Sequence, residues 1–460
     1  MNFPTYVTLL QLIGSICLIL TLKYFSSPKF ASRGLYYCIF GMLISIISIL
    51  FTPIIFNKLL IITAILIGAV IGGYIALNVK MTSIPQLVAG FHSLVGLVAV
   101  LIAYVLYYKG TYHFGFLKRF EMIIGLFVGA ITFTGSIVAL GKLQGFISSR
   151  ALIFKGQKYC LMFLCLANLC SIFYFCLHGN AVLFYLILFS GLILGMLLVL
   201  PVGGADMPVI VSMLNSYSGW ACVGIGFTLG NNLLIITGAL IGSSGAILSN
   251  LMCKAMNRSL FNVIFKAFLV SSQKSNMTAA SEEKNPNLAY PQDIAAILHN
   301  ANSVIIVPGY GMAVAQSQYI IKSLYDLLVS KNISVKFAIH PVAGRMPGHM
   351  NVLLAEASID YSVMFELEDI NSDFKNTDVV LVIGANDITN PAAKNDPESP
   401  IYGMPVLDVE SARTIVFIKR SLAQGYSQIE NNLFFKSNSL MVFGGAKQML
   451  EKIVKEFEIF

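Results

Sequence analysis

Nine runs of apolar residues, each long enough to cross a lipid bilayer, occupy the first part of this 460-residue chain. They lie at about residues 5–25, 34–52, 59–79, 84–108, 120–141, 159–178, 182–202, 208–229 and 231–252. Lipid cannot satisfy backbone polar groups, so runs of about 20 apolar residues cross a membrane as helices. Charged residues make up only 11% of the chain, against about 25% in soluble domains. The sequence predicts a polytopic all-α membrane part of about nine helices.

The character of the sequence changes after these runs. A polar stretch over 271–293, rich in Ser, Asn and Pro, is typical of a linker. Short apolar strands then alternate with helical stretches, the strands lying at 303–309, 333–341, 379–387, 413–421 and from 439 onward. This alternation is typical of a parallel sheet, so we predict a Rossmann-like α/β domain. The predicted boundaries are a membrane domain over 1–262, a linker over 263–292 and the α/β domain over 293–460.

Lysine and arginine are distributed unevenly among the loops. If the N-terminus lies outside, the outer loops hold only Lys58, Lys109, Lys118 and Arg119, and the inner loops hold the remaining loop cations. Because inner loops carry the excess of basic residues, the α/β domain is predicted to be cytoplasmic. The net charge of +8 reflects these loops and does not suggest nucleic-acid binding. No two of the eight cysteines have C-x-x-C spacing, and we predict no metal site.

The stretch "VIIVPGYGMAV" (304–314) has the pattern of a strand, a G-x-G-x-x-V turn and a helix. Gly309 would permit a tight turn, and Gly311 would let backbone N–H groups approach a pyrophosphate at a helix N-terminus. Val314 stands where Gly or Ala is usual. The same spacing in "GIGFTL" (224–229) falls inside a membrane run, where glycine serves helix packing. We predict one dinucleotide site, in the α/β domain.

The type of dinucleotide is suggested by the ends of two strands. An NAD site would place an acid at the end of the second strand, but that strand ends at His340-Pro341 and the next acid is Glu356. A later strand ends instead in Lys419, Arg420 and Ser421. Two cations and a hydroxyl suit a phosphate, although an exposed basic turn would look the same. The pattern favours NADP.

Two long loops follow predicted strands. They are "HPVAGRMPGHMNVLLAEA" (340–357) and "GANDITNPAAKNDPESPIYGMPV" (384–406). Ligands of open α/β sheets bind at loops that follow the strands, so both are predicted to border the site. A hydrolase-like Ser-His-Asp set is disfavoured because no nucleophile elbow is present.

A few polar residues lie within the apolar runs. His92, in "VAGFHSLVGLVAV" (88–100), is the most notable, because an ionisable group at membrane depth is costly. A histidine with an ordinary pKa of about 6.5 can take up and release protons at cellular pH. The alternative is a neutral imidazole in a packing contact. Thr134, Ser136, Asp206 and Asn215 are further candidates, although Ser, Thr and Asn often only join helices.

These residues resemble one family along nearly the whole chain. The stretches "VPGYGMAVAQ", "IHPVAGRMPGHMNVLLAEA", "VLVIGAND", "SPIYGMPVL", "FIKRS" and "GGADMPVIVSMLNSYSGW" are similar to the β subunit of proton-translocating nicotinamide nucleotide transhydrogenase. The resemblance implies an oxidoreductase and translocase, in which an NADP(H)-binding domain follows the β part of a membrane domain. It implies an NAD(H)-binding α subunit without which the chain is inactive, a dimer of α–β units, and the bacterial inner (cytoplasmic) membrane.

The resemblance also implies roles for individual residues. The residues around the cofactor would be Gly309, Tyr310, Gly311, Met312, Ala313, Val314, His340, Arg345, Gly384, Ala385, Asn386 and Asp387. Lys419, Arg420 and Ser421 would hold the 2′-phosphate, and loops around 400–405 and at Gly425 and Tyr426 would cover the cofactor. In the membrane, His92 would relay protons, with Asn215, Ser136 and Asp206 as its companions, and Arg258 would lie at the hinge to the linker.

Two other interpretations remain open from the residues. A transporter or channel gated by a nucleotide-sensing domain would have the same two parts, but no selectivity filter or pair of interrupted helices is visible. A membrane dehydrogenase that uses a quinone would need a flavin or metal site, and the sequence shows neither.

Overall fold

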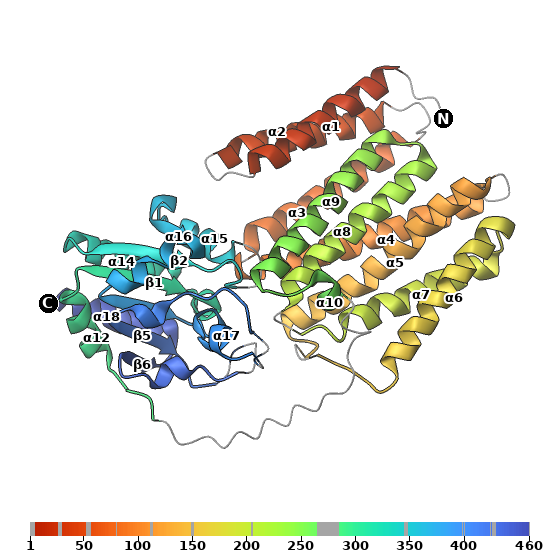
Figure 1. Ribbon diagram of the computed structural model, residues 1–460. Helices are drawn as coiled ribbons and strands as arrows, with labels where there is room; N and C mark the ends of the chain where they lie inside the picture. The colour runs from red at the N-terminus through yellow and green to blue at the C-terminus, as the bar shows by residue number, and fades with distance from the viewer. Residues whose placement is uncertain are drawn as a thin grey trace. The chain divides into compact units, whose positions relative to one another are not determined.

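A computed structural model describes residues 5–459, apart from residues 26–29, 52–56, 80, 111–113, 149–150, 204–205, 265–284, 345–347, 398, 400, 424 and 426–428. The chain divides into two compact units, one built mainly from residues 1–203 and 210–249, the other mainly from residues 250–263 and 271–460. The first unit is helical and the second is α/β (Figure 1). Most of the predicted linker lies outside the described residues, and the domain boundaries stay a prediction.

The described residues contain nine helices that are long and apolar enough to span a membrane. They are α1 (Thr5–Phe25), α2 (Ala31–Leu50), α3 (Lys58–Asn78), α4 (Ile84–Gly110), α5 (Phe116–Gln144), α6 (Gln157–His178), α7 (Ala181–Val199), α8 (Met207–Leu229) and α9 (Asn232–Ala255). Each begins and ends within a few residues of a predicted run. The prediction of about nine membrane helices is confirmed.

The helices of the first unit pack through glycine. On α4 and α5, a Cβ added to Gly96 would lie 2.7 Å from the carbonyl oxygen of Gly129, so the two backbones touch. On α8 and α9, a Cβ added to Gly219 would lie 2.4 Å from the backbone N of Gly242. The Ser216 hydroxyl donates to the Gly242 carbonyl at 2.7 Å across the same interface. Small residues and hydroxyls of this kind hold helices together where lipid provides no hydrophobic driving force.

The second unit is built on one six-stranded parallel sheet with the order β3-β2-β1-β4-β5-β6. The strands are β1 (Ser303–Pro308), β2 (Ser334–Ile339), β3 (Met364–Glu366), β4 (Val379–Ile383), β5 (Thr414–Lys419) and β6 (Ser439–Phe443). The order reverses between β1 and β4, which is the arrangement of doubly wound dinucleotide-binding folds. The predicted Rossmann-like sheet is confirmed.

The strand β3 was not among the predicted strands. It has only three residues, Met364–Glu366, and it pairs on one side only, with β2 at the edge of the sheet. None of its residues is buried. A strand so short and exposed lacks the apolar run by which the other five are visible in the sequence.

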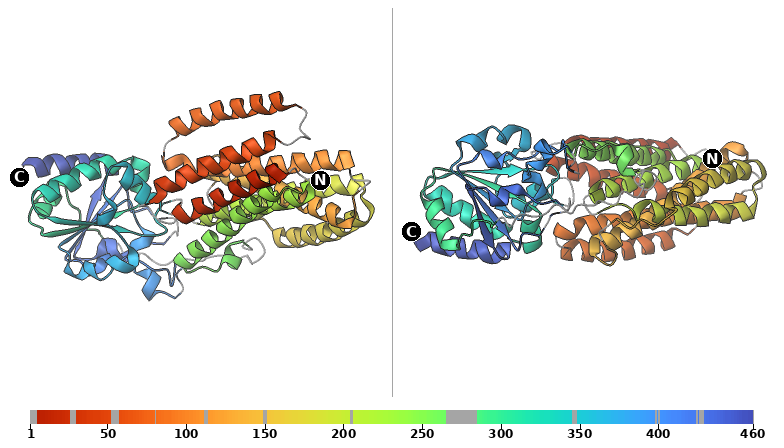
Figure 2. Two further views of the ribbon diagram at one scale, coloured as in Figure 1. Left: turned by 90° about the horizontal axis from the view of Figure 1, so that it is seen from above. Right: turned by 60° about the horizontal axis from the view of Figure 1, so that its bottom comes forward.

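Helices lie on both sides of the sheet (Figure 2). They include α12 (Pro291–His299), α13 (Tyr310–Ala315), α14 (Gln318–Ser330), α15 (His349–Glu356) and α18 (Ala446–Ile459). The sequence predicted a helix after the turn at 309–314, and the structure has two helices there. Gln316 has a positive φ of 49° and ends α13, after which α14 begins at Gln318. A hydrophobic core of this unit is formed by residues between Ile294 and Phe457.

We expect the variant Gly219→Ala to destabilise the helical unit. The added Cβ would lie 2.4 Å from backbone, which cannot move as a side-chain tip can, and overpacking typically costs about 1–3 kcal/mol. The matched control is Gly68→Ala on α3, because no atom lies within 4 Å of its added Cβ. Thermal unfolding in detergent should show a lower melting temperature for Gly219→Ala than for Gly68→Ala. Equal melting temperatures would contradict the close α8–α9 contact.

Candidate functional site

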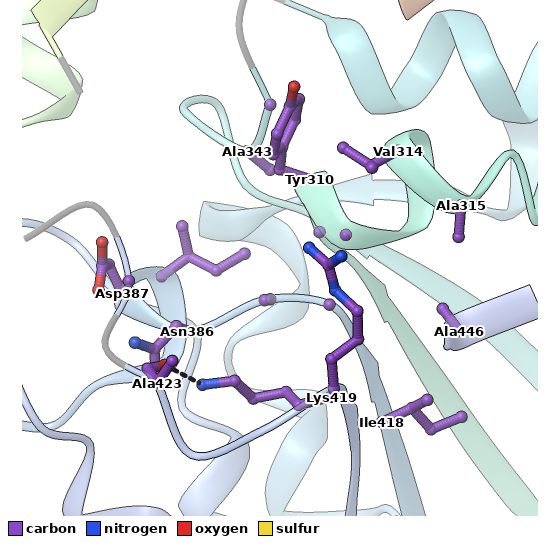
Figure 3. A pocket seen from close by; sticks show the side chains of 18 of the residues that line it. Tyr310, Val314, Ala315, Ala343, Asn386, Asp387, Ile418, Lys419, Ala423 and Ala446 are labelled. Atoms are coloured by element: carbon purple, nitrogen blue, oxygen red, sulfur yellow. Dashed lines mark hydrogen bonds between the residues drawn. The ribbon is translucent and has the colours of Figure 1, made fainter. Parts of the chain in front are cut away.

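A cavity of about 720 Å³ opens at the carboxyl ends of β1, β4 and β5 (Figure 3). Its lining comes from the turns that follow these strands and includes Gly309–Gly311, Val314, Gly384–Ile388 and Ile418–Ser421. The cavity therefore lies where the strand order reverses, which is where open α/β sheets bind their ligands. Its volume is in the range of small-molecule sites, about 300–1,000 Å³.

Two glycine turns pack directly against each other at the base of the cavity. The N–H of Gly309 donates to the carbonyl of Ile383 at 2.9 Å, and the N–H of Gly311 donates to the carbonyl of Gly384 at 2.9 Å. A Cβ added to Gly311 would lie 2.6 Å from the Cα of Gly384, and Gly384 itself has a φ of 63°. The glycines thus allow one turn to touch another, and the Gly311 amide already has a backbone acceptor.

Asn386 and Asp387 follow the second of these turns. Both polar atoms of the Asn386 amide are buried, and neither has a hydrogen-bond partner among the described residues. A Cβ added to Gly425 would lie 2.5 Å from Asp387 Oδ1, so the chain at Gly425 closes directly over this side chain. Buried amides are almost always hydrogen-bonded. The Asn386 amide is therefore an exception, a buried donor and acceptor without a partner among the described residues.

The end of β5 brings two cations to the same cavity. Lys419 Nζ donates to the carbonyl of Ala423 at 3.1 Å and lies 4.4 Å from the centre of the Phe434 ring. Figure 3 shows this side chain extended toward Asn386 and Ala423. Burial lowers the pKa of Lys419 to about 8, and the carboxylate of Asp387 opposes the shift. An anion bound beside Lys419 would raise this pKa again.

The other two residues of this basic strand end also border the cavity. Arg420 and Ser421 both line it, and both are exposed, so their polar groups are accessible to a ligand. The Ser421 hydroxyl accepts a hydrogen bond from the N–H of Ala423 at 3.3 Å. Ala423 therefore holds both side chains in this short turn. Its carbonyl accepts from the Lys419 ammonium, and its N–H donates to the Ser421 hydroxyl.

His340 is held away from the cavity by two backbone contacts. Its Nδ1 accepts from the N–H of Val342 at 3.2 Å, which leaves the proton on Nε2, and Nε2 donates to the Pro405 carbonyl at 2.7 Å. The ring is 1% exposed, and burial lowers its pKa to about 4. His340 thus ties the turn after β2 to the loop that ends at Pro405. The side chains of Met312 and Ala313 are likewise in the core, fully buried.

In the helical unit, packing places three predicted residues at nearly one depth. A Cβ added to Gly96 would lie 2.7 Å from the N of Phe133, so His92, one turn earlier on α4, is level with Ser136 on antiparallel α5. A Cβ added to Gly135 would lie 3.1 Å from Leu214 on α8, which puts Asn215 within one turn of the same level.

Two polar atoms at this level need a partner. His92 Nε2 and Ser136 Oγ are buried, and no described residue forms a hydrogen bond with either. Asp206 lies elsewhere, just before α8 begins and about two and a half turns from Asn215. Its carboxylate is buried and accepts a hydrogen bond from Nη1 of Arg258 in an ion pair. The structure therefore brings His92, Ser136 and Asn215 to one level but not Asp206.

Residues 7–456 match the family described as NAD(P) transhydrogenase beta subunit. Two relatives with the description NAD(P) transhydrogenase subunit beta come from Rhodospirillum rubrum, one of them from a defined strain. Each is 51% identical over 453 residues, which cover 96% of this chain and 97% of the relative. The chain belongs to the NAD(P) transhydrogenase beta subunit family.

Family membership confirms the resemblance drawn from the sequence. A transhydrogenase beta subunit implies oxidoreductase activity on nicotinamide nucleotides, and the name implies an alpha subunit as partner. The nine apolar helices indicate that this family member is a membrane protein. The comparisons favour this interpretation over a transporter or channel gated by a nucleotide.

Further small or apolar residues line the cavity of this transhydrogenase chain. Ala343, Gly344, Ile401 and Met404 belong to the two loops that the sequence predicted to border the site, whereas Gly444, Gly445 and Ala446 were not among the predicted site residues. One signal could have revealed these three: "VFGGAK" (442–447) is a strand end followed by two glycines and a helix start. Of the predicted cofactor residues, Arg345 and Tyr426 lie outside the described residues, as does Pro400 in the predicted covering loop.

We expect the stability of the isolated α/β unit, residues 285–460, to fall as the pH drops from about 6.5 to about 4. The folded pKa of His340 lies near 4, below the ordinary value of 6.5, so the unfolded chain binds more protons in this window. The contribution of neutral His340 to the free energy of unfolding is fully present above pH 6.5. It reaches about 3 kcal/mol there, since one pKa unit corresponds to about 1.4 kcal/mol. Denaturant unfolding at several pH values measures it.

The variant His340→Gln is the control for this pH dependence. Its amide can still donate to the Pro405 carbonyl, but it cannot titrate, so the loss of stability between pH 6.5 and 4 should become smaller. An unchanged dependence in His340→Gln would show that other groups cause it.

Proposed function

We propose that this chain binds NADP(H) in the cavity above β1, β4 and β5. The observation that carries the proposal is the charge around the cavity: Lys419 and Arg420 line it at the end of β5, whereas β2 ends at Ile339 and His340 follows, with no acid. A carboxylate at that strand end would accept the ribose hydroxyl of NAD. Cations instead suit the additional 2′-phosphate of NADP.

The residues present fit such a cofactor. The unpartnered amide of Asn386 is buried beside the cavity and offers both a donor and an acceptor to the nucleotide. The contact between the turns at Gly309–Gly311 and Gly384 leaves a floor without side chains, onto which a planar or phosphate group can settle. We propose that these turns, with Tyr310 and Val314, surround the pyrophosphate, and that Gly425 and Tyr426 cover the nucleotide. Met312, Ala313 and His340 would support these contacts from the core, and Arg345 would join them.

The bound nicotinamide supplies hydride chemistry, and the chain's own residues bind, orient and enclose it. No general acid or base is needed for a direct transfer between two nicotinamides, which agrees with the small and apolar lining at Ala343 and Gly344. The chain has one dinucleotide fingerprint, so we propose that the alpha subunit binds NAD(H) and that turnover requires both subunits. The proposed assembly is a dimer of α–β units in the bacterial inner membrane, with the α/β unit in the cytoplasm.

We further propose that hydride transfer is coupled to proton movement through the helical unit, with His92 as the proton relay and Ser136 and Asn215 beside it. The shared level of the three residues and the unpartnered atoms of His92 and Ser136 support this. One proton that moves down about 150 mV releases roughly 3.5 kcal/mol. That would shift the ratio of the two redox couples roughly 300-fold.

We expect Arg420→Ala to weaken NADPH binding by about 1.5–3 kcal/mol, the value of a hydrogen bond to a charged group. NADH binding should hardly change, because NADH has no 2′-phosphate. Isothermal titration calorimetry on residues 285–460 tests this, since this part has its own core. Arg413→Ala is the matched control, because Arg413 is 84% exposed and its cation lies 4.0 Å from Asp378, away from the cavity lining. Equal wild-type affinity for NADH and NADPH would refute the assignment.

We expect His92→Ala to abolish proton uptake and to slow coupled transhydrogenation strongly, when the chain is reconstituted with its alpha subunit in proteoliposomes. The physical reason is that an alanine cannot exchange protons at the level of Ser136 and Asn215. NADP(H) binding to the α/β unit should persist. The control is His178→Ala, which removes an imidazole from the last position of α6. A stable His92→Ala enzyme with a normal ratio of protons to hydride would show that His92 only packs.

A further inference from the structure

A second polar level lies on α5, two turns beyond Ser136, at Lys142. This lysine is among the largest fully buried side chains of the described residues, with 2% exposure. A cation buried in a membrane-spanning helix is costly and is retained where it contacts specific groups. Nothing in the proposed relay of His92, Ser136 and Asn215 uses it.

Lys142 holds the end of another helix. Its Nζ donates to the carbonyls of Leu200 and Val202, the latter at 2.7 Å. Leu200 is the C-cap of α7, where carbonyls lack intrahelical donors and the helix dipole favours a positive charge. The turn that follows continues along the chain to Asp206 and to α8. Lys142 therefore fixes the point at which the chain turns from α7 into α8.

The register of the helices puts two polar residues, Lys142 and Gln86, at this second level. From the contact of Gly135 with Leu214, two turns along antiparallel α5 and α8 bring Lys142 level with the start of α8. On α4, Gln86 reaches the same end of α5, since its Nε2 donates to the Leu143 carbonyl at 3.4 Å. Gln86 Oε1 is buried and has no hydrogen-bond partner among the described residues.

This level lies between His92 and one membrane face. Gln86 and Lys142 are near the ends of α4 and α5 that share a face with the end of α9, because successive spanning helices alternate in direction. A span of six residues, from Gln86 to His92, corresponds to about 9 Å along a helix. The α9 end is where the chain passes into the α/β unit. A proton exchanged between His92 and that face would therefore pass the level of Gln86 and Lys142.

We propose that Lys142 is a positioning residue for proton exchange at His92, and that together with Gln86 it forms the end of the proton path at the membrane face where α9 ends. Lys142 keeps the start of α8 in register with α5, so that Asn215 stays level with Ser136 and His92. Gln86 offers its unpartnered carbonyl oxygen to water at this end. This inference rests on the proposed coupling of hydride transfer to proton movement.

Arg119 at the opposite end of α5 makes a comparable contact. Its Nη1 donates to the Leu177 carbonyl at 3.0 Å and to the Cys176 carbonyl at 3.4 Å, at the C-terminus of α6. Like Lys142, it satisfies carbonyls at a helix end with a cation. Arg119 lies far along α5 from Ser136, at the other membrane face. A variant of Arg119 therefore distinguishes a general loss of helix packing from a loss of proton transfer along the proposed path.

The experiment compares Lys142→Met, Lys142→Arg and Arg119→Met in the full chain, reconstituted with the alpha subunit in proteoliposomes. Proton uptake and hydride transfer are recorded together, and their ratio is the readout. We expect Lys142→Met to lower the ratio several-fold, because α8 would no longer hold Asn215 level with Ser136 and His92. Lys142→Arg should restore most of the ratio, because its guanidinium can still donate to Leu200 and Val202. Arg119→Met should keep the wild-type ratio, even if its melting temperature falls.

A wild-type ratio in Lys142→Met, or an equal loss in Arg119→Met, would overturn the proposal. If Lys142→Met does not accumulate, Gln86→Leu tests the same level without removing a charge, and a wild-type ratio in that enzyme would overturn the proposal as well. Absence of proton uptake by the wild-type complex would instead reject the proposed coupling itself, so the two failures are distinguishable.

Discussion

Close approach of backbone to backbone, made possible by glycine, is the constraint on which both units depend. In the helical unit it joins α4 to α5 at Gly96 and Gly129, where lipid offers no hydrophobic gain for helix association. In the α/β unit it joins the turn at Gly311 to the turn at Gly384. Each contact lies beside a candidate site: His92 is one turn from Gly96, and the cavity opens above Gly311. The packing contacts and the candidate sites therefore lie at neighbouring positions.

Cations that donate to backbone carbonyls form a second recurring element. Lys142 and Arg119 donate to the last carbonyls of α7 and α6, and Lys419 donates to the carbonyl of Ala423. In each case backbone oxygens hold a positive charge in place. For Lys419 this leaves the ammonium ready for an anion, and burial lowers its pKa to about 8, so a bound phosphate and a bound proton would favour each other.

The two histidines that the sequence singled out have opposite surroundings. Both ring nitrogens of His340 are engaged by backbone groups of Val342 and Pro405, which fixes one neutral tautomer. His92 has a buried Nε2 for which the described residues offer no partner. A locked ring suits a structural tie between loops, and a ring with an unpartnered nitrogen suits exchange with water or with a group of another subunit. The residue type alone could not distinguish these two surroundings.

The sequence by itself determined the secondary structure and its division into a membrane part and an α/β part. Nine spanning runs, five apolar strands and one G-x-G turn are local patterns, and each depends only on residues close together in the chain. Where the pattern is weak, as in the edge strand β3, the sequence did not show the element.

Only the tertiary structure decided which distant residues meet. It placed the turn of Gly311 against Gly384, turned His340 away from the cavity, put Asp206 about two and a half turns from Asn215, and showed that Lys142 holds the end of α7. Such contacts depend on how helices and strands far apart in the chain pack side by side. Their register is set by the shapes of all the side chains between them, which no short stretch of sequence contains.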